Sequence, residues 1–230
     1  KPDNSSSIWD RAASQLNTTK PLKGFTILVA DDHEVNYVIA KEIMLPWGAN
    51  VVYAEDGEKA LNKVIDEDLD LILMDMQMPN VDGIECTKFI RLLDKPKSEI
   101  PIIAMTAAAL PEEREKCLRS GMNDYISKPY KPSVLHEIIS NQLLKTKPKK
   151  KTKASSEANE KKGLYNLDYL KEISGNSTTF INEMIFSFIK DMPKLIEEFS
   201  FSIEKLDFIS ISELSHKYKS MASYMGSDKL

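Results

Sequence analysis

The sequence predicts an α/β domain built on a doubly wound, five-stranded parallel sheet, followed by an all-α segment that packs as a helical bundle. Three observations lead to this prediction. Within residues 24–144, short apolar runs alternate with amphipathic stretches of helical periodicity. A lysine-rich stretch over residues 145–163 then interrupts the pattern. Residues 164–230 show helical periodicity without strand-like alternation.

The apolar runs are the expected strands, and they cover residues 25–30, 51–54, 69–74, 100–105 and 125–127. Helical stretches follow them, beginning near Glu34, Gly57, Gly83, Leu110 and Pro132. Because a helix follows each strand, the strands are expected to run parallel. Right-handed crossovers then place helices on both faces of the sheet.

Two polar stretches are expected to be linkers. Residues 1–23 carry many Ser and Thr and few sizeable apolar groups, which is typical of a linker from an upstream module. Residues 145–163 combine lysines with Thr, Ser and Pro and offer nothing to bury, which favours a flexible tether. The chain begins without Met and stops inside a helical pattern, so we expect a piece of a longer polypeptide.

The C-terminal segment is expected to contain helices near residues 167–173, 178–206 and 211–225. Pro193 predicts a kink or a break within the second of them. Asn176, Ser177 and Thr178 are candidate caps at its start. An antiparallel bundle is the natural way for such helices to bury their apolar faces.

The composition excludes several classes of protein. The chain is 42% hydrophobic and 29% charged, which is typical of a globular protein. No apolar run approaches the roughly eighteen residues needed to cross a bilayer, and we expect no membrane contact. A formal charge of −4 argues against a nucleic-acid binder. Cys86 and Cys117 lack CxxC spacing and are expected to be reduced thiols in the cytoplasm.

Polar side chains stand at the carboxyl ends of four of the predicted strands. Asp31 and Asp32 follow the first strand, Asp75 follows the third, Thr106 the fourth and Lys128 the fifth. The carboxyl ends of parallel strands meet at one edge of the sheet, where ligands gather in open α/β folds. We therefore expect these five side chains to share one rim.

The chemistry of this rim points to a metal ion and a phosphoryl group. Three neighbouring carboxylates repel one another unless a cation lies between them, and oxygen ligands suit Mg²⁺. A carboxylate held beside Mg²⁺ can attack phosphorus and form an acyl phosphate, and Asp75 is the candidate. Lys128 would offset the charge of the phosphoryl oxygens, and the Thr106 hydroxyl would donate to one of them.

Four motifs resemble the receiver domains of two-component response regulators, which have a flavodoxin-like fold: ILVADDHEVN, LILMDMQMPNVDG, PIIAMTA and YISKPY. The resemblance covers residues 24–144. It implies that Asp75 accepts the phosphoryl group and that Mg²⁺ is held by Asp31, Asp32, Asp75 and the backbone carbonyl of Gln77.

The same resemblance assigns three further roles. It implies that Thr106 and Lys128 contact the phosphoryl group. Tyr125, three residues before Lys128, matches the aromatic residue that moves with the threonine when such domains are phosphorylated.

His216 is a second candidate site. Helical geometry places one apolar face on Ile211, Leu214, Tyr218, Met221, Ala222 and Met225. His216 lies nearly opposite this face, so we expect an exposed imidazole, flanked by Lys219. A neutral imidazole nitrogen is nucleophilic enough to accept a phosphoryl group, and Lys219 can offset the incoming charge.

The stretch HKYKSMASYMG resembles the HxxK[GS]…LG signature of histidine phosphotransfer domains. Those domains fold as four-helix bundles, and residues 164–230 stop before the last helices expected. We therefore expect this domain to be C-terminally incomplete.

A receiver followed by a phosphotransfer domain on one chain resembles the carboxyl-terminal part of a hybrid sensor histidine kinase. This resemblance implies transfer from an upstream histidine kinase core of the same polypeptide to Asp75, then to His216, then to a separate response regulator. The parent kinase would be cytosolic or anchored in the inner membrane. The chain lacks the asparagine box and the glycine-rich lid of the ATP-binding kinase module, so it should not phosphorylate itself from ATP.

Two alternatives stay open. The receiver could remain unphosphorylated and serve as a docking or inhibitory module of a hybrid kinase. A phosphohydrolase of the haloacid dehalogenase type also forms an aspartyl phosphate. That chemistry requires an Asp two residues after the nucleophile, where this chain has Gln77.

Overall fold

The computed structural model describes residues 20–107, 111–143 and 166–226. The expected linker over residues 145–163 lies outside these ranges, as do residues 1–19 of the N-terminal one.

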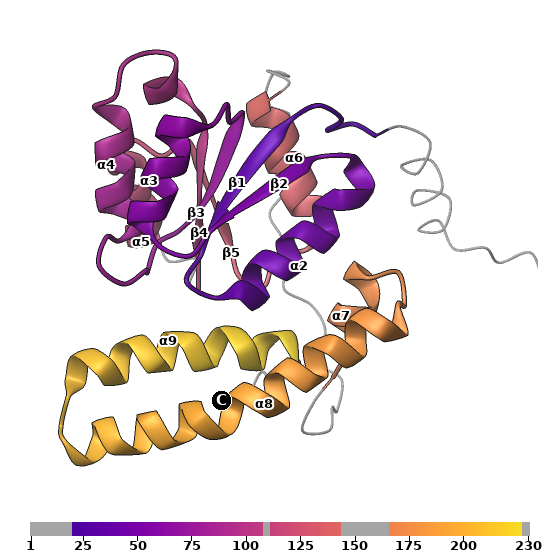
Figure 1. Ribbon diagram of the computed structural model, residues 1–230, viewed down its shortest axis with the longest axis vertical. Helices are drawn as coiled ribbons and strands as arrows, with labels where there is room; N and C mark the ends of the chain where they lie inside the picture. The colour runs from indigo at the N-terminus through magenta and orange to yellow at the C-terminus, as the bar shows by residue number, and fades with distance from the viewer. Residues whose placement is uncertain (1–19, 108–110, 144–165, 227–230) are drawn as a thin grey trace, which may run out of the picture.

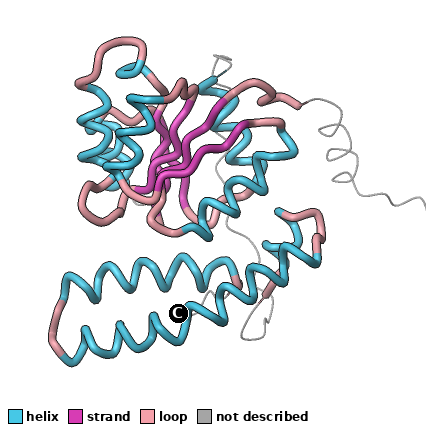
Figure 2. The backbone as a smooth tube through the Cα atoms, in the orientation of Figure 1, coloured by secondary structure: helices cyan, strands magenta, loops and turns pink. Residues whose placement is uncertain are grey.

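The core of the fold is a five-stranded sheet in the order β2-β1-β3-β4-β5, with every neighbouring pair parallel. Its strands are β1 (Thr26–Ala30), β2 (Asn50–Ala54), β3 (Leu71–Asp75), β4 (Ile102–Thr106) and β5 (Asp124–Ser127). Figure 2 shows them as one twisted layer between helices. The predicted doubly wound α/β fold is confirmed.

Helices cover both faces of this sheet. They are α2 (Glu34–Met44), α3 (Gly57–Asp66), α4 (Gly83–Arg91), α5 (Pro111–Ser120) and α6 (Pro132–Leu143). Single turns of 3₁₀ helix occupy Leu45–Trp47 and Lys97–Glu99. Figure 1 shows α2 and α6 on one face and α3, α4 and α5 on the other. All residues of β3 and β4 are buried, as strands covered on both faces should be.

The packed domain includes residues that precede β1. Leu22 is fully buried in the hydrophobic cluster between the sheet and α2, and its backbone N–H donates to the carbonyl of Trp47 at 2.9 Å. The turn over residues 20–23 therefore belongs to the folded unit, although the sequence places residues up to 23 in a linker.

The C-terminal segment is helical throughout its described residues. It consists of α7 (Asp168–Ile173), α8 (Thr178–Glu204) and α9 (Phe208–Tyr224). Ser177 is the N-cap of α8, and its hydroxyl accepts the backbone N–H of Phe180 at 3.4 Å. In Figure 1, α8 and α9 form an antiparallel pair, with α9 lying between α8 and the α/β domain.

Pro193 lies inside α8, which continues without a break. The prediction of a break there is wrong. Pro193 is exposed, so the backbone carbonyl that loses its partner one turn earlier can bond to water. The other side of the helix keeps its packing, because Met192 and Leu195 are buried against Met221 of α9.

Both cysteines are buried free thiols, as the sequence predicts. Among the described helices, none is long and apolar enough to span a membrane.

Candidate functional site

The predicted rim forms at the carboxyl ends of the strands. Asp31 and Asp32 follow β1, Asp75 ends β3, Thr106 ends β4, and Lys128 follows β5. Strands β1, β3, β4 and β5 are consecutive neighbours in the sheet, so their ends lie side by side. Asp31, Asp75, Thr106 and Lys128 are all buried.

Lys128 joins the two most deeply buried carboxylates. Its Nζ lies 2.7 Å from Asp31 Oδ2 and 2.7 Å from Asp75 Oδ2, and all three side chains are at most 2% exposed. Burial alone would lower the pKa of Lys128, but the two carboxylates outweigh burial and raise it. The lysine is therefore charged and holds both acids in place.

The single positive charge of Lys128 does not balance the charges of the neighbouring carboxylates. Burial raises the pKa of Asp75 to about 7; Lys128 opposes that rise, and Asp31 and Asp32 add to it. A carboxylate whose ionised form is disfavoured although it is paired with a lysine gains stability from a further cation. The residues present therefore fit a divalent metal ion, which Asp31, Asp32 and Asp75 would hold through oxygen.

His33 belongs to the same cluster, although it is not among the residues predicted from the sequence. Its side chain has a ligand-type atom within 4.8 Å of those of Asp31 and Asp32, and its Nδ1 shares a hydrogen bond of 2.8 Å with Asp32 Oδ1. The Asp31 carboxylate also accepts the Asn36 side-chain amide at 2.6 Å and the backbone N–H of His33 at 3.0 Å. These bonds fix two carboxylates beside Asp75. Their position in the sequence could have indicated this role, because His33 and Asn36 lie in the motif ILVADDHEVN together with Asp31 and Asp32.

Thr106 ends β4, and Tyr125 lies on the neighbouring strand β5, where it pairs with Ala104. The Thr106 hydroxyl donates to Glu113 of α5 at 2.7 Å. Tyr125 is half-buried, and Arg114 of α5 lies 5.5 Å from its ring centroid. Both residues therefore contact α5, so a movement of either is felt by that helix.

The loop after β3 closes tightly around Asp75. The Gln77 backbone N–H donates to Asp75 Oδ1 at 3.3 Å. Gly83 begins α4, and a Cβ at this position would lie 2.0 Å from the backbone oxygen of Asp75. Only glycine allows α4 to start this close to the site.

His216 faces this rim, and the prediction of an exposed imidazole is wrong. Its side chain is half-buried, and its Nε2 is buried without a hydrogen-bond partner among the described residues. Burial lowers the pKa of His216, the charge of Lys128 lowers it further, and Asp32 and Asp31 oppose that change. The ring thus lies within the field of the rim residues. The sequence correctly placed His216 away from the apolar face of α9, but the receiver-like domain covers it.

Lys219 approaches the rim one helical turn after His216. It is exposed, and its Nζ lies 3.4 Å from the backbone carbonyl of Ala107, the residue after Thr106. The structure therefore brings both predicted residues of α9 to the edge that carries Asp75.

A shared apolar core holds the helical segment against the α/β domain. One hydrophobic cluster contains residues of β1, β3, α2 and α6 together with residues of α7, α8 and α9. The Tyr169 hydroxyl of α7 donates to the backbone carbonyl of Tyr130 at 3.2 Å, and the ring of Tyr169 stacks on that of Tyr224 at 5.7 Å. This contact explains why His216 lies beside the rim.

Asp75→Asn is expected to stabilise the metal-free protein. Above pH 7 the buried Asp75 is ionised at a cost, because burial has raised its pKa from 3.8 to about 7. The stabilising contribution of protonated Asp75 is fully present below about pH 4 and is lost as the pH rises through 7. Asparagine stays neutral at every pH, so the variant does not lose this contribution. We expect a gain of about 1–3 kcal/mol in unfolding free energy at pH 8, which shrinks towards pH 5. Urea unfolding with EDTA at both pH values measures it; a gain independent of pH would contradict the assignment.

Comparison with known proteins assigns the α/β domain to a family. The response regulator receiver domain family matches residues 27–140. The sensor protein GacS of Pseudomonas syringae is 38% identical over 115 residues, which cover 49% of this chain and 13% of GacS. The sensor protein EvgS of Escherichia coli O157:H7 is 30% identical over 228 residues, covering 97% of this chain and 18% of EvgS.

A solved structure agrees. The co-crystal structure of the Saccharomyces cerevisiae histidine phosphotransfer signaling protein Ypd1 and the receiver domain of its downstream response regulator Ssk1 matches with 28% identity and a TM-score of 0.51. The match covers 54% of this chain and 91% of that chain.

The hybrid signal transduction histidine kinase I of Dictyostelium discoideum is 38% identical over 148 residues, covering 61% of this chain and 8% of that kinase. This chain therefore spans less than a fifth of each of these curated relatives. Residues 27–140 form a response regulator receiver domain of the kind found in two-component signalling and hybrid histidine kinases, and a helical C-terminal segment follows it.

Proposed function

We propose that this chain accepts a phosphoryl group on Asp75 from a histidine kinase core of the same polypeptide and passes it to His216. His216 then delivers it to the receiver of a separate response regulator. The observation that carries the proposal is the placement of His216, a half-buried histidine of α9 that faces the rim holding Asp75. Its Nε2 is buried and has no hydrogen-bond partner within the part of the chain that the structure describes.

Loading of Asp75 depends on charge balance within the pocket. An Asp75 oxygen attacks the phosphorus of the donor phosphohistidine, and the P–N bond breaks with its electrons returning to the donor imidazole. Lys128, already 2.7 Å from Asp75 Oδ2, is placed to offset the charge of the phosphoryl oxygens. A bound Mg²⁺ would neutralise further charge, and we assign Asp31, Asp32, Asp75 and the Gln77 carbonyl to hold it. The Thr106 hydroxyl would leave Glu113 and donate to the phosphoryl group.

Transfer to His216 reverses the chemistry. The lowered pKa keeps the imidazole neutral near pH 7, so the Nε2 lone pair is available to attack phosphorus. The N–P bond forms, the bond between phosphorus and the Asp75 oxygen breaks, and the electron pair returns to the carboxylate. Lys219, beside Ala107, is placed to offset the charge of the phosphoryl group as it moves.

Two comparisons support the proposal. The match to the sensor protein EvgS runs over 97% of this chain, so the receiver and the C-terminal helices occur together in a similar sensor. A receiver domain similar to this one has been crystallised with a histidine phosphotransfer protein. We place the relay in the cytoplasm, where the buried free thiols of Cys86 and Cys117 would stay reduced.

We assign residues 164–230 to a histidine phosphotransfer domain that follows the receiver. Besides its buried stripe, α8 carries a second apolar stripe of Phe186, Ile189, Ile196 and Ile203. These side chains are 49–70% exposed and recur at intervals of three or seven residues, which places them on one side of the helix. Such a stripe is typical of a helix that packs against further helices of a bundle.

The test is to locate the phosphoryl group in the full chain. With labelled acetyl phosphate and Mg²⁺, we expect base-labile label on Asp75 first, then acid-labile label on His216. In His216→Gln, only the base-labile label should form. Acid-labile label that persists in His216→Gln would contradict the assignment of the histidine.

The same experiment separates a relay from a docking module. A receiver that acts only as a docking or inhibitory surface should take no label and show no spectral change with beryllofluoride and Mg²⁺. A relay receiver should respond to both reagents.

Mg²⁺ should stabilise the chain through Asp32. At a concentration of 100 times its dissociation constant, the ion is expected to raise the unfolding free energy by roughly 2.7 kcal/mol. Asp32→Asn should lose most of this gain because it removes an oxygen ligand, whereas Asp66→Asn, at an exposed position of α3, should keep it. Thermal unfolding with increasing Mg²⁺ measures the effect; equal gains in the two variants would place the ion elsewhere.

A further inference from the structure

We propose that the pair of helices α8 and α9, here called the C-terminal hairpin, is a gate over Asp75. The hairpin must leave the receiver before a histidine of another domain or another molecule can reach Asp75. This inference rests on the proposed function and adds regulation to the same site.

Asp75 is enclosed by the residues that the structure describes. Its side chain is 1% exposed, and Lys128 closes one side of its carboxylate. Phosphoryl transfer needs the donor nitrogen, the phosphorus and the acceptor oxygen roughly in line. A donor imidazole must therefore approach the rim where His216 now lies. Two histidines do not fit over one carboxylate at once, so the hairpin and any external donor compete.

Specific contacts hold the hairpin in place. Val35 and Met184 line an apolar hollow together with Leu170, Phe188, Met221, Tyr224 and Met225. Lys219 reaches the backbone carbonyl of Ala107, and the charge on Lys219 faces an acidic rim. The docked form is therefore a defined state, stabilised by burial of apolar surface and by charge.

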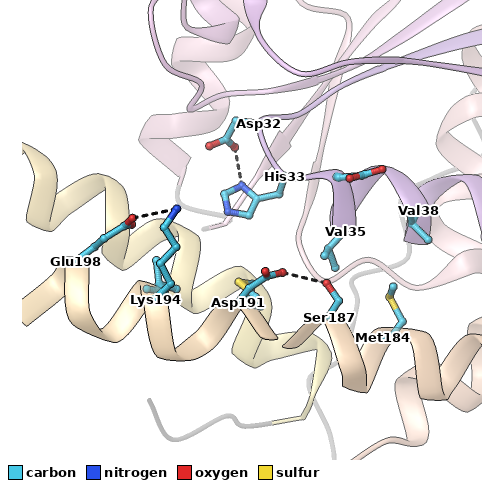
Figure 3. Close-up of a pocket in the computed structure, with 12 residues that line it drawn as sticks. Asp32, His33, Val35, Val38, Met184, Ser187, Asp191, Lys194 and Glu198 are labelled. Carbon is cyan, nitrogen blue, oxygen red and sulfur yellow. Dashed lines mark hydrogen bonds and ion pairs between the residues drawn. The ribbon is translucent and has the colours of Figure 1, made fainter. Parts of the chain in front are cut away.

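Part of the contact between the hairpin and the receiver is a cleft rather than packed core. A cleft of about 320 Å³ lies between α2 and the hairpin. Figure 3 shows its lining: Val35 and Val38 face Met184 across it, and Asp191, Lys194 and Glu198 of α8 lie near His33. Docking buries no apolar surface where this solvent-open cleft lies, so this part of the contact contributes little to holding the hairpin. Release of the hairpin must give up the apolar burial that it shares with the α/β domain, while Met192, Leu195 and Met221 still hold α8 and α9 together.

The experiment uses two full-length chains in which the hairpin of one must reach the receiver of the other. The donor is Val35→Asp/Asp75→Asn, which keeps an intact hairpin but has a damaged receiver face. Phosphoramidate loads its His216. The reference acceptor is His216→Gln, which has an intact receiver and a closed gate. Transfer breaks the P–N bond on the donor and forms an O–P bond on Asp75 of the acceptor.

Two further acceptors open the gate without altering the receiver. His216→Gln/Met184→Asp places a charge in the apolar contact. His216→Gln/Lys219→Glu places a negative charge beside the acidic rim, at an exposed position where folding is not at risk. The matched control is His216→Gln/Ile189→Asp. Ile189 lies on α8, as Met184 does, but it is 64% exposed and does not line the cleft.

If the hairpin is a gate, both opened acceptors should be loaded about tenfold faster than the reference. The loading rate is then proportional to the fraction of acceptor molecules whose hairpin has left the receiver. The control acceptor should be loaded at the reference rate. Equal rates in the reference and in either folded, opened acceptor would overturn the gate. Acetyl phosphate with Mg²⁺ is applied to every acceptor in parallel. If it labels none of them on Asp75, the proposed function fails rather than the gate.

Discussion

Asp75→Asn is expected to abolish phosphorylation at both sites of the chain when acetyl phosphate is the donor. The amide nitrogen and oxygen of Asn are poor nucleophiles, so no acyl phosphate forms, and His216 then has no phosphoryl group to accept. We expect label on both residues to fall by about 100-fold or more. Mass spectrometry at neutral pH, or label stability in acid and base, measures the two sites separately.

Asp82→Asn is the matched control for this prediction. Asp82 lies in the same loop and caps α4, where its side chain accepts the backbone N–H of Glu85 at 2.8 Å. Asn caps a helix about as well as Asp, so this variant changes a nearby charge and keeps the fold. Undiminished label on His216 in Asp75→Asn would contradict the order of transfer.

Lys128→Met is expected to cause the largest loss of stability. Its Nζ is the cation shared by the buried carboxylates of Asp31 and Asp75, and methionine leaves both acids without it. Removing one partner from a buried ion pair costs about 3–5 kcal/mol, because the remaining charge is left in a poorly solvating site. Urea unfolding in the absence of Mg²⁺ measures the change.

Two further variants test the cause of that loss. Lys63→Met removes a half-exposed pair with Glu67, one turn along α3, and should cost about 0.5 kcal/mol or less. Lys128→Met/Asp75→Asn should recover part of the stability, since one of the two abandoned charges is gone. A loss of the same size in Lys63→Met, or no recovery in the double variant, would show that packing rather than charge explains the effect.

The sheet could be predicted from the sequence because its strands are apolar runs with clear ends. Each expected strand agrees with the observed one to within two residues at either end. The rim followed from the same pattern, because parallel strands end at a common edge. Local signals also placed the start of α8, where Ser177, one of three adjacent candidate caps, is the N-cap.

Other features depend on contacts between distant parts of the chain. Leu22 is one apolar residue in a polar stretch, and only the packing of α2 and the sheet around it reveals that it is core. Pro193 should interrupt a helix, but its exposed position in α8 lets the helix continue. His33 follows two aspartates in the motif ILVADDHEVN, but this position alone does not say what its ring contacts. Its role becomes visible only when its ring lies against Asp32.

The sequence by itself determined that Asp31, Asp75 and Lys128 share one rim, since each stands at the end of a predicted strand and parallel strands end at a common edge. Tertiary structure alone decided what faces that rim. Helical periodicity places His216 on the polar side of α9, and that side could equally have faced water. The receiver covers it because the apolar residues of α2, α7 and α8 are buried together, and such non-directional packing between distant segments leaves no trace in local sequence.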